Sequence, residues 1–141
     1  MTLDPEKVRT KVQFIRDSLR RLEDIRGRGK EAFLADSILQ DAALRSLQVA
    51  IQAVLDTAHH IVAREGLGVP KDYRDSLAIL IQHGILPKEG SDDLLRMVSF
   101  RNRIVHLYES VDPPEVWAVL EQHLHDFDVF LNAIAQRCFP R

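Results

Sequence analysis

Apolar residues recur at three- and four-residue steps along almost the whole chain, as they do on a helix that buries one face. The first stripe follows Asp4-Pro5, a pair typical of a helix start, and comprises Val8, Val12, Ile15, Leu19, Leu22 and Ile25. No segment alternates with period two over the length of a strand, and no Asn-Gly or Asp-Gly hairpin turn occurs. The sequence therefore predicts an all-α fold.

Glycine and proline signals divide this pattern into five expected helices. Their approximate ranges are 5–26, 31–65, 72–83, 91–108 and 113–137. We expect the first two to form a long antiparallel pair across the glycines at 27 and 29. The second helix is apolar on both sides, which predicts that both sides are buried and suggests a second copy of the chain as one partner.

The chain has 141 residues, 45% of them apolar, which predicts a single domain over residues 1–141. The net charge of -2 argues against a protein that coats a nucleic-acid backbone, but it leaves room for a small basic site. The single Cys138 excludes an internal disulfide and a thiolate zinc cluster. No apolar run reaches the roughly 18–20 residues of a spanning helix, and no secretory signal opens the chain, so we expect a soluble cytoplasmic protein.

The fourth expected helix has a cation at the centre of its apolar stripe. Because a guanidinium does not lose its proton, Arg101 is costly there unless it is paired or reaches a ligand. Two interpretations stay open, a ligand-binding arginine and an ion pair with an acid such as Asp56, which would orient Arg101 within the subunit or across a dimer. The stripe itself comprises Leu94, Met97, Val98, Ile104, Val105 and Tyr108.

The same helix carries further polar groups suited to phosphodiester chemistry. Asn102 and His106 are four residues apart, so they lie side by side on the flank of the stripe. An imidazole exchanges protons near neutral pH, and an arginine stabilises charge that builds on phosphate oxygens. Tyr108 returns to the side of Arg101 two turns later.

These residues form the pattern Arg-x4-His-x-Tyr at positions 101, 106 and 108, which resembles the signature of the HepT branch of HEPN domains. Residues 42–61 are similar to the long second helix of that branch, and Tyr73-Arg74 with the later Gly84-Ile85-Leu86 fits its next segment. The resemblance covers essentially the whole chain in order, and it implies a HEPN-type bundle of four to five helices.

The resemblance also implies a function, a ribonuclease toxin of a two-gene toxin–antitoxin pair. Such proteins are metal-independent endoribonucleases without a cofactor, and their active-site cleft lies between the subunits of a homodimer. Carried over by position, Arg101 and His106 would be the catalytic pair and Asn102 a polar helper. Tyr108 would accept AMP from the partner, a minimal nucleotidyltransferase antitoxin. Cleavage of RNA would leave a 2′,3′-cyclic phosphate.

Alternatives from other classes remain. A non-catalytic HEPN module could bind a nucleotide or a partner protein through the same groove, but the intact Arg101, Asn102 and His106 favour the nuclease. A weaker hypothesis gives the basic stretch around Arg26 and Arg28 a role in guiding RNA or meeting an acidic partner. We expect no metal site, because the pairs His59-His60 and His123-x-His125 cannot chelate from one helix.

Overall fold

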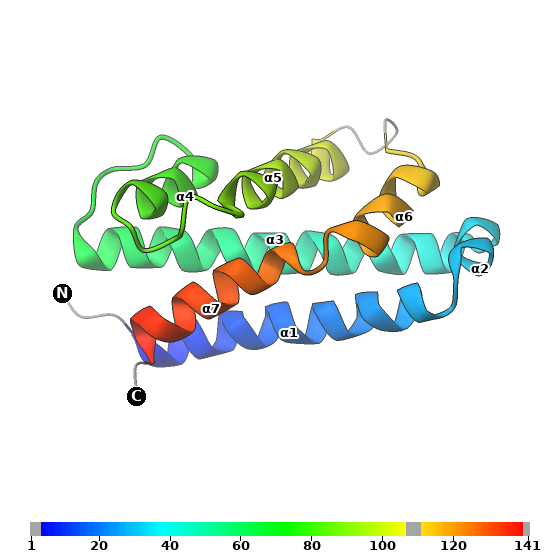
Figure 1. Cartoon of the computed structure of the whole chain (residues 1–141), viewed down its shortest axis with the longest axis horizontal. Coiled ribbons are helices and arrows are strands. Elements are labelled where there is room, and N and C mark those ends of the chain that lie inside the picture. The colour runs from blue at the N-terminus through cyan, green and yellow to red at the C-terminus, as the bar shows by residue number, and fades with distance from the viewer. Residues whose placement is uncertain (1–3, 107–110, 140–141) are drawn as a thin grey trace.

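The computed structural model describes residues 4–106 and 111–139, with only the backbone of His106. Seven helices and no strand occur in this part of the chain (Figure 1), which confirms the all-α prediction. None of these helices is both long and apolar enough to cross a membrane. The helices are α1 (Pro5–Gly27), α2 (Lys30–Ala35), α3 (Ser37–Glu65), α4 (Tyr73–Gln82), α5 (Ser91–His106), α6 (Pro113–Gln122) and α7 (Asp126–Cys138).

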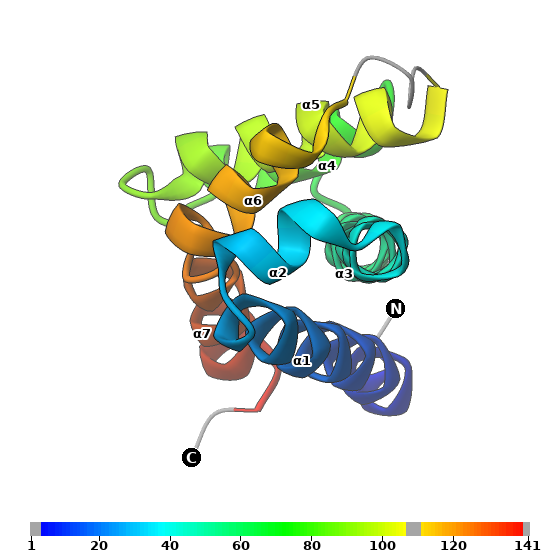
Figure 2. The ribbon, with the colours of Figure 1, turned by 90° about the vertical axis from the view of Figure 1, so that its right-hand side faces the viewer.

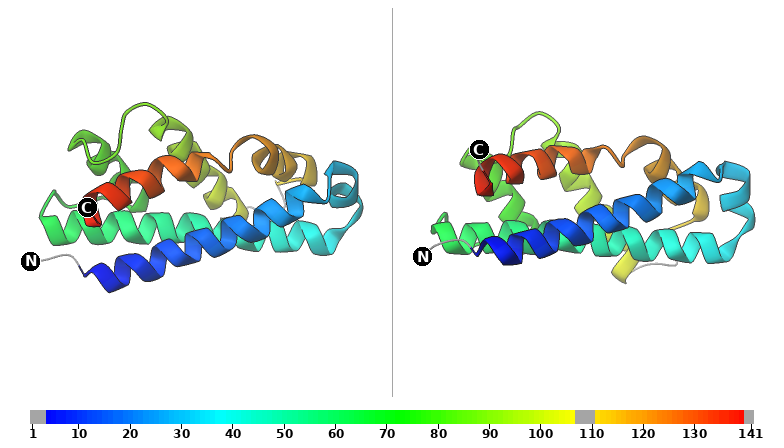
Figure 3. Two further views of the ribbon diagram at one scale, coloured as in Figure 1. Left: turned by 60° about the horizontal axis from the view of Figure 1, so that its bottom comes forward. Right: turned by 90° about the horizontal axis from the view of Figure 1, so that it is seen from below.

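The long helices α1 and α3 form the predicted antiparallel pair. They lie side by side and run in opposite directions in the views of Figures 1 and 3. Asp4 caps α1 by accepting bonds from the backbone N–H groups of Glu6 and Lys7. Gly29, at φ +96°, supplies a backbone conformation that other residues rarely adopt and turns the chain out of α1.

The second expected helix is divided at Asp36, which the periodicity did not indicate. Asp36 has an extended backbone, and its carboxylate accepts bonds from the N–H groups of Ile38 and Leu39, so it caps α3. The amide of Gln40 donates to the carbonyl oxygens of Phe33 and Leu34 and satisfies the end of α2. This break turns α2 so that the fully buried Phe33 lies in the core.

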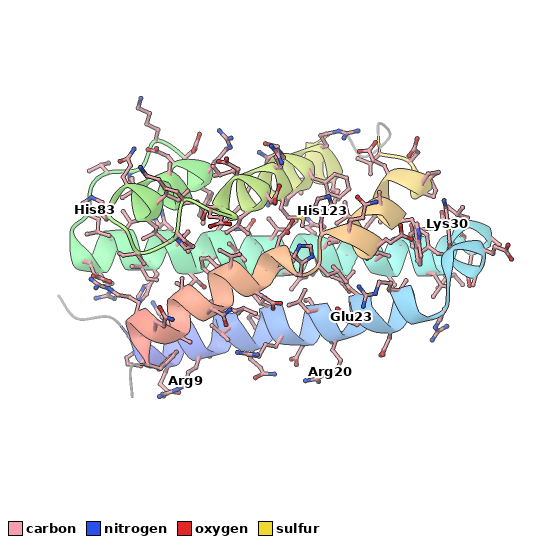
Figure 4. The ribbon with its side chains drawn as sticks, in the orientation of Figure 1. Arg9, Arg20, Glu23, Lys30, His83 and His123 are labelled. Atoms are coloured by element: carbon pink, nitrogen blue, oxygen red, sulfur yellow. The ribbon has the colours of Figure 1, made fainter. Side chains whose placement is uncertain are left out.

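The fifth expected helix is also divided, because α6 ends at Gln122 and α7 begins at Asp126. Asp126 is 3% exposed, and its carboxylate lies 2.9 Å from the His123 ring and 3.3 Å from the His125 ring. The turn that holds these side chains together lets α6 pack on α2 and α3 while α7 packs on α5 and α1. Figure 4 shows His123 at the junction of the two helices.

Helix α3 is the central element of the bundle. In the nearly end-on view of Figure 2 it lies between α1 on one side and α4 and α5 on the other. The two-sided apolar pattern of α3 is therefore explained largely by partners within the chain, and this burial does not require a second copy. Its fully buried side chains include Leu47, Ile51, Leu55 and Ile61.

A histidine of α3 contacts the start of α1. The Nε2 atom of His60 accepts a hydrogen bond from the backbone N–H of Asp4 at 3.3 Å. Burial, followed by the positive charges of Arg64 and Lys7, lowers the pKa of His60 below its ordinary 6.5, and the charge of Asp4 opposes this only in part. The folded state therefore favours the neutral ring, which is also the form that can accept the bond.

This linkage predicts how stability depends on pH. Because the unfolded chain binds a proton at His60 more readily, the stability that this group contributes is present above pH 6.5 and is lost as pH falls through the lower folded pKa. We expect His60→Gln to lose less stability than the wild type between about pH 7 and about pH 5 in denaturant titrations. His83→Gln, at an exposed position, is the control. Equal losses in the wild type and in His60→Gln would contradict the assignment.

Candidate active site

Helix α5 is held by its apolar side, and this fixes where Arg101 lies. Leu94, Met97, Val98 and Ile104 are buried against the rest of the core, so α5 packs closely on α3, α4 and α7. Arg101 lies in the same stripe, as the helical wheel predicted, and its side chain points to α3. The guanidinium is half-buried, and its Nε atom is inaccessible to solvent and has no hydrogen-bond partner.

The partners of Arg101 are amides. Its Nη2 atom donates to Oε1 of Gln52 at 2.6 Å, and Nη1 donates to Oδ1 of the exposed Asn102 at 3.2 Å. By contrast, Arg103 forms a bidentate ion pair with Glu115 of α6, so the charge of Arg103 is compensated. Among the described residues, Arg101 has no carboxylate within ion-pair distance.

Within the chain Asp56 does not pair with Arg101, and the pairing across a dimer stays a prediction. Asp56 forms its salt bridge with Lys11 of α1, with Oδ2 at 3.1 Å from Nζ. Its other oxygen, Oδ1, accepts a bond from Nε2 of Gln52 at 2.9 Å. Gln52, one turn before Asp56 on α3, therefore lies between the acid and Arg101, and the four side chains form a continuous chain of hydrogen bonds.

These side chains border a cavity of about 200 Å³ between α1, α3 and α5. Arg45, which also lines it, is exposed and has no ion-pair partner among the residues that the structure describes. With Lys11 and Asp56 paired to each other, the charge left at the cavity is that of two guanidinium groups. Such a site is suited to an anion with several oxygen acceptors, such as a phosphate. The lining is Lys11, Phe14, Arg45, Gln48, Val49, Gln52, Ala53, Asp56 and Arg101, and we call it the Arg101 cavity.

The structure brings together Arg101, Asn102 and, through Gln52, Asp56. His106 ends α5, so its backbone continues the helix that carries Arg101, about 7.5 Å further along the axis. Its side chain and the whole of Tyr108 lie outside the described residues. Their predicted roles therefore remain predictions.

The histidines of the two pairs singled out in the sequence have partners within the chain. The Nδ1 atom of His59 is 3.3 Å from Oγ of Ser76, and its ring lies 5.5 Å from that of Tyr73. His60 accepts the bond from Asp4 described above, and the other histidine pair flanks Asp126. No group of three histidine, cysteine or acidic side chains suited to a metal ion occurs within residues 4–106 and 111–139.

Arginines in the basic stretch near the end of α1 form ion pairs with acids on the same helix. Arg20 lies 3.6 Å from Asp17, and Arg26 lies 2.6 Å from Glu23. Figure 4 shows Arg9 and Arg20 on the edge of α1 that faces away from α3. The exposed ion pairs favour the interpretation of this stretch as a solvated helix face.

Apart from Asp56, sequence reasoning missed the residues that α3 and α1 contribute to the site. Arg45, Gln48, Gln52 and Asp56 follow one another at three- and four-residue steps, so they form one polar row on a helix that is otherwise mostly apolar. That row is visible in the sequence. Its partner Lys11, 45 positions before Asp56, could be found only from the packing of α1 on α3.

Comparison with known proteins places these features in a family. The model of the HepT-like ribonuclease family matches residues 15–134. The mRNA nuclease HepT of Shewanella oneidensis is 35% identical over 124 residues, covering 88% of this chain and 92% of that protein. The tRNA nuclease HepT of Aphanizomenon flos-aquae is 24% identical over 132 residues, covering 94% and 90%.

Solved structures of toxin–antitoxin complexes are also similar to this chain. A toxin–antitoxin crystal structure with AMP-PNP matches with a TM-score of 0.85 at 32% identity, covering 92% of this chain and 97% of that one. The tri-AMPylated HEPN toxin of Shewanella oneidensis in complex with MNT antitoxin matches with a TM-score of 0.84 at 34% identity, covering 91% and 96%. The chain belongs to the HepT-like ribonuclease family of HEPN proteins.

Proposed function

We propose that this chain is a metal-independent endoribonuclease toxin that acts as a single HepT-like domain. The observation that carries the proposal is the half-buried Arg101, which is bonded to amides and borders a cavity with a second unpaired guanidinium, Arg45. A cation that is fixed but not compensated is what binding of a phosphodiester requires. Relatives named mRNA nuclease and tRNA nuclease support RNA as the substrate.

In the proposed reaction, the 2′-oxygen of the RNA attacks the adjacent phosphorus. His106, from one or both subunits, takes the proton of the 2′-hydroxyl, and a protonated imidazole gives one to the departing 5′-oxygen as the P–O5′ bond breaks. Arg101 holds the phosphate and its developing charge, and Asn102 orients its neighbours. Because the nucleophile belongs to the substrate, the product is a 2′,3′-cyclic phosphate and a free 5′-hydroxyl.

We place this reaction in a cleft between two copies of the chain. The Arg101 cavity lies between α1, α3 and α5, and the backbone of His106 continues the helix that carries Arg101. A second copy would complete the walls around a single-stranded RNA and supply a second imidazole. This homodimer is part of the proposal.

The proposed regulator is an MNT-type nucleotidyltransferase antitoxin, as in the related complex with a tri-AMPylated HEPN toxin. The hydroxyl oxygen of Tyr108 would attack the α-phosphorus of ATP, lose its proton and release pyrophosphate, leaving AMP on the ring. The added negative charge would lie two residues after His106 and compete with RNA for the Arg101 guanidinium.

Cleavage of RNA in EDTA tests the reaction. We expect the wild type to cut a single-stranded RNA with chelator present, and Arg101→Ala and His106→Ala each to lose at least about 100-fold in rate, because each removes a group acting on the transition state. Gel analysis and phosphatase treatment would identify the cyclic phosphate ends. Arg96→Ala, which removes an exposed ion pair on the same helix, is the control. Full activity in either site variant, or loss of wild-type cleavage with chelator, would overturn the proposal, and RNA binding without cleavage by the wild type would support a non-catalytic module.

Modification of Tyr108 is tested by mass spectrometry of the intact chain after incubation with an MNT-type nucleotidyltransferase and ATP. We expect added AMP units and loss of ribonuclease activity in the wild type. Tyr108→Phe should keep its activity and gain no AMP at this position, since it lacks only the acceptor oxygen. Tyr73→Phe, at an exposed tyrosine outside the motif, is the matched control and should be inhibited like the wild type. AMP on Tyr108→Phe in the peptide that contains position 108 would exclude this acceptor.

A further inference from the structure

Gln52 determines how the Arg101 guanidinium is held. Its side-chain oxygen accepts from Arg101 at 2.6 Å, and its side-chain nitrogen donates to Asp56 at 2.9 Å. The orientation of this amide follows from its neighbours, because an arginine can only donate and a carboxylate only accept. Gln52 therefore contacts the cation and the acid at the same time, each through the atom it requires.

The same arrangement also leaves the positive charge of Arg101 without a carboxylate partner in the part of the chain that the structure describes. Asp56 is the acid that Arg101 would otherwise meet on α3, and Asp56 is already satisfied by Lys11 on one oxygen and by Gln52 on the other. The Asp56 and Lys11 side chains are 28% and 37% exposed, so the pair is partly shielded from solvent. The neutral amide thus keeps Arg101 in a defined position and lies between it and Asp56, the acid that lines the same cavity.

We propose that Gln52 is a positioning residue that fixes Arg101 while leaving its positive charge free for an RNA phosphate. This inference rests on the proposed function, because it assumes that Arg101 contacts RNA. A carboxylate at the same position would form a charge-assisted pair with the guanidinium and compete directly with phosphate. It would also lose the donor to Asp56 and place two carboxylates side by side.

The chain offers a matched control one turn earlier on α3. Gln48 lines the same cavity and has the same side chain, but it has no hydrogen bond to Arg101. Gln48→Glu therefore adds an equal charge to the same wall, with a general repulsion of RNA but without an ion pair to Arg101. The difference between Gln52→Glu and Gln48→Glu isolates the effect of the Gln52–Arg101 contact.

The test is a double-mutant cycle on RNA affinity in the full-length chain. The dissociation constant of a single-stranded RNA oligonucleotide is measured by fluorescence anisotropy, with His106→Ala as the common background to prevent cleavage. We expect Gln52→Glu to weaken binding about 10-fold or more, as expected for a lost charge-assisted contact. We expect Gln48→Glu to weaken it distinctly less. When Arg101→Ala is added, Gln52→Glu should have no larger effect than Gln48→Glu.

A purely structural role for Gln52 would predict the opposite result. If Gln52→Glu weakens binding as much without Arg101 as with it, or no more than Gln48→Glu does, the inference is wrong. Should Gln52→Glu fail to give the wild-type helical spectrum and melting temperature, Gln52→Ala replaces it, with a smaller loss that also disappears in the Arg101→Ala background.

Failure of the proposed function and failure of the role of Gln52 would give different results. Unchanged RNA affinity in Arg101→Ala alone would remove the phosphate-binding role of Arg101 and with it the proposed function. A clear loss in Arg101→Ala together with additive Gln52→Glu would overturn only the role of Gln52. The slope of log affinity against log salt adds a second readout, since losing one phosphate contact to single-stranded RNA reduces it by about 0.7.

Discussion

A guanidinium set into the apolar face of a helix must be hydrogen-bonded, because it cannot shed its charge and burying it unpaired is costly. In this protein the bonds to Arg101 come from two amides, Gln52 on α3 and the neighbouring Asn102. Each amide accepts one bond from the guanidinium without cancelling its charge, while the Nε donor has no hydrogen-bond partner among the described residues. The rest of the candidate site depends on this distinction, since an arginine already paired with a carboxylate would have little left to offer a phosphate.

Helix α3 supplies both the core and this polar contact. It packs between α1 on one side and α4 and α5 on the other, and 12 of its 29 residues are buried, so packing on both sides fixes its position. The polar row that includes Gln52 and Asp56 emerges where α1 and α5 leave a cavity. A side chain on a helix that is packed on two sides keeps its geometry better than one on a loop. Gln52 on α3 is such a side chain, which favours precise placement of Arg101.

The features predicted from the sequence are those with local causes. Apolar spacing indicated the helices and the antiparallel pair, and the wheel placed Arg101 on the packing side of α5. The breaks at Asp36 and at residues 123–125 were missed because both segments keep a helical apolar pattern, and the interruptions depend on contacts such as the buried Asp126. The partner of Arg101 was missed for a related reason. A nearby acid is the expected partner of a half-buried cation, but Asp56 is occupied by Lys11, a contact between residues 45 positions apart.

The most direct test of this account is a crystal structure of the chain with a single-stranded RNA whose 2′-hydroxyls are methylated, so that the attacking group is blocked. The account predicts a phosphate oxygen within hydrogen-bond distance of the Arg101 guanidinium, with the Gln52 contact to Arg101 retained. A complex in which Arg101 is paired with a carboxylate and the RNA phosphates lie elsewhere would contradict it.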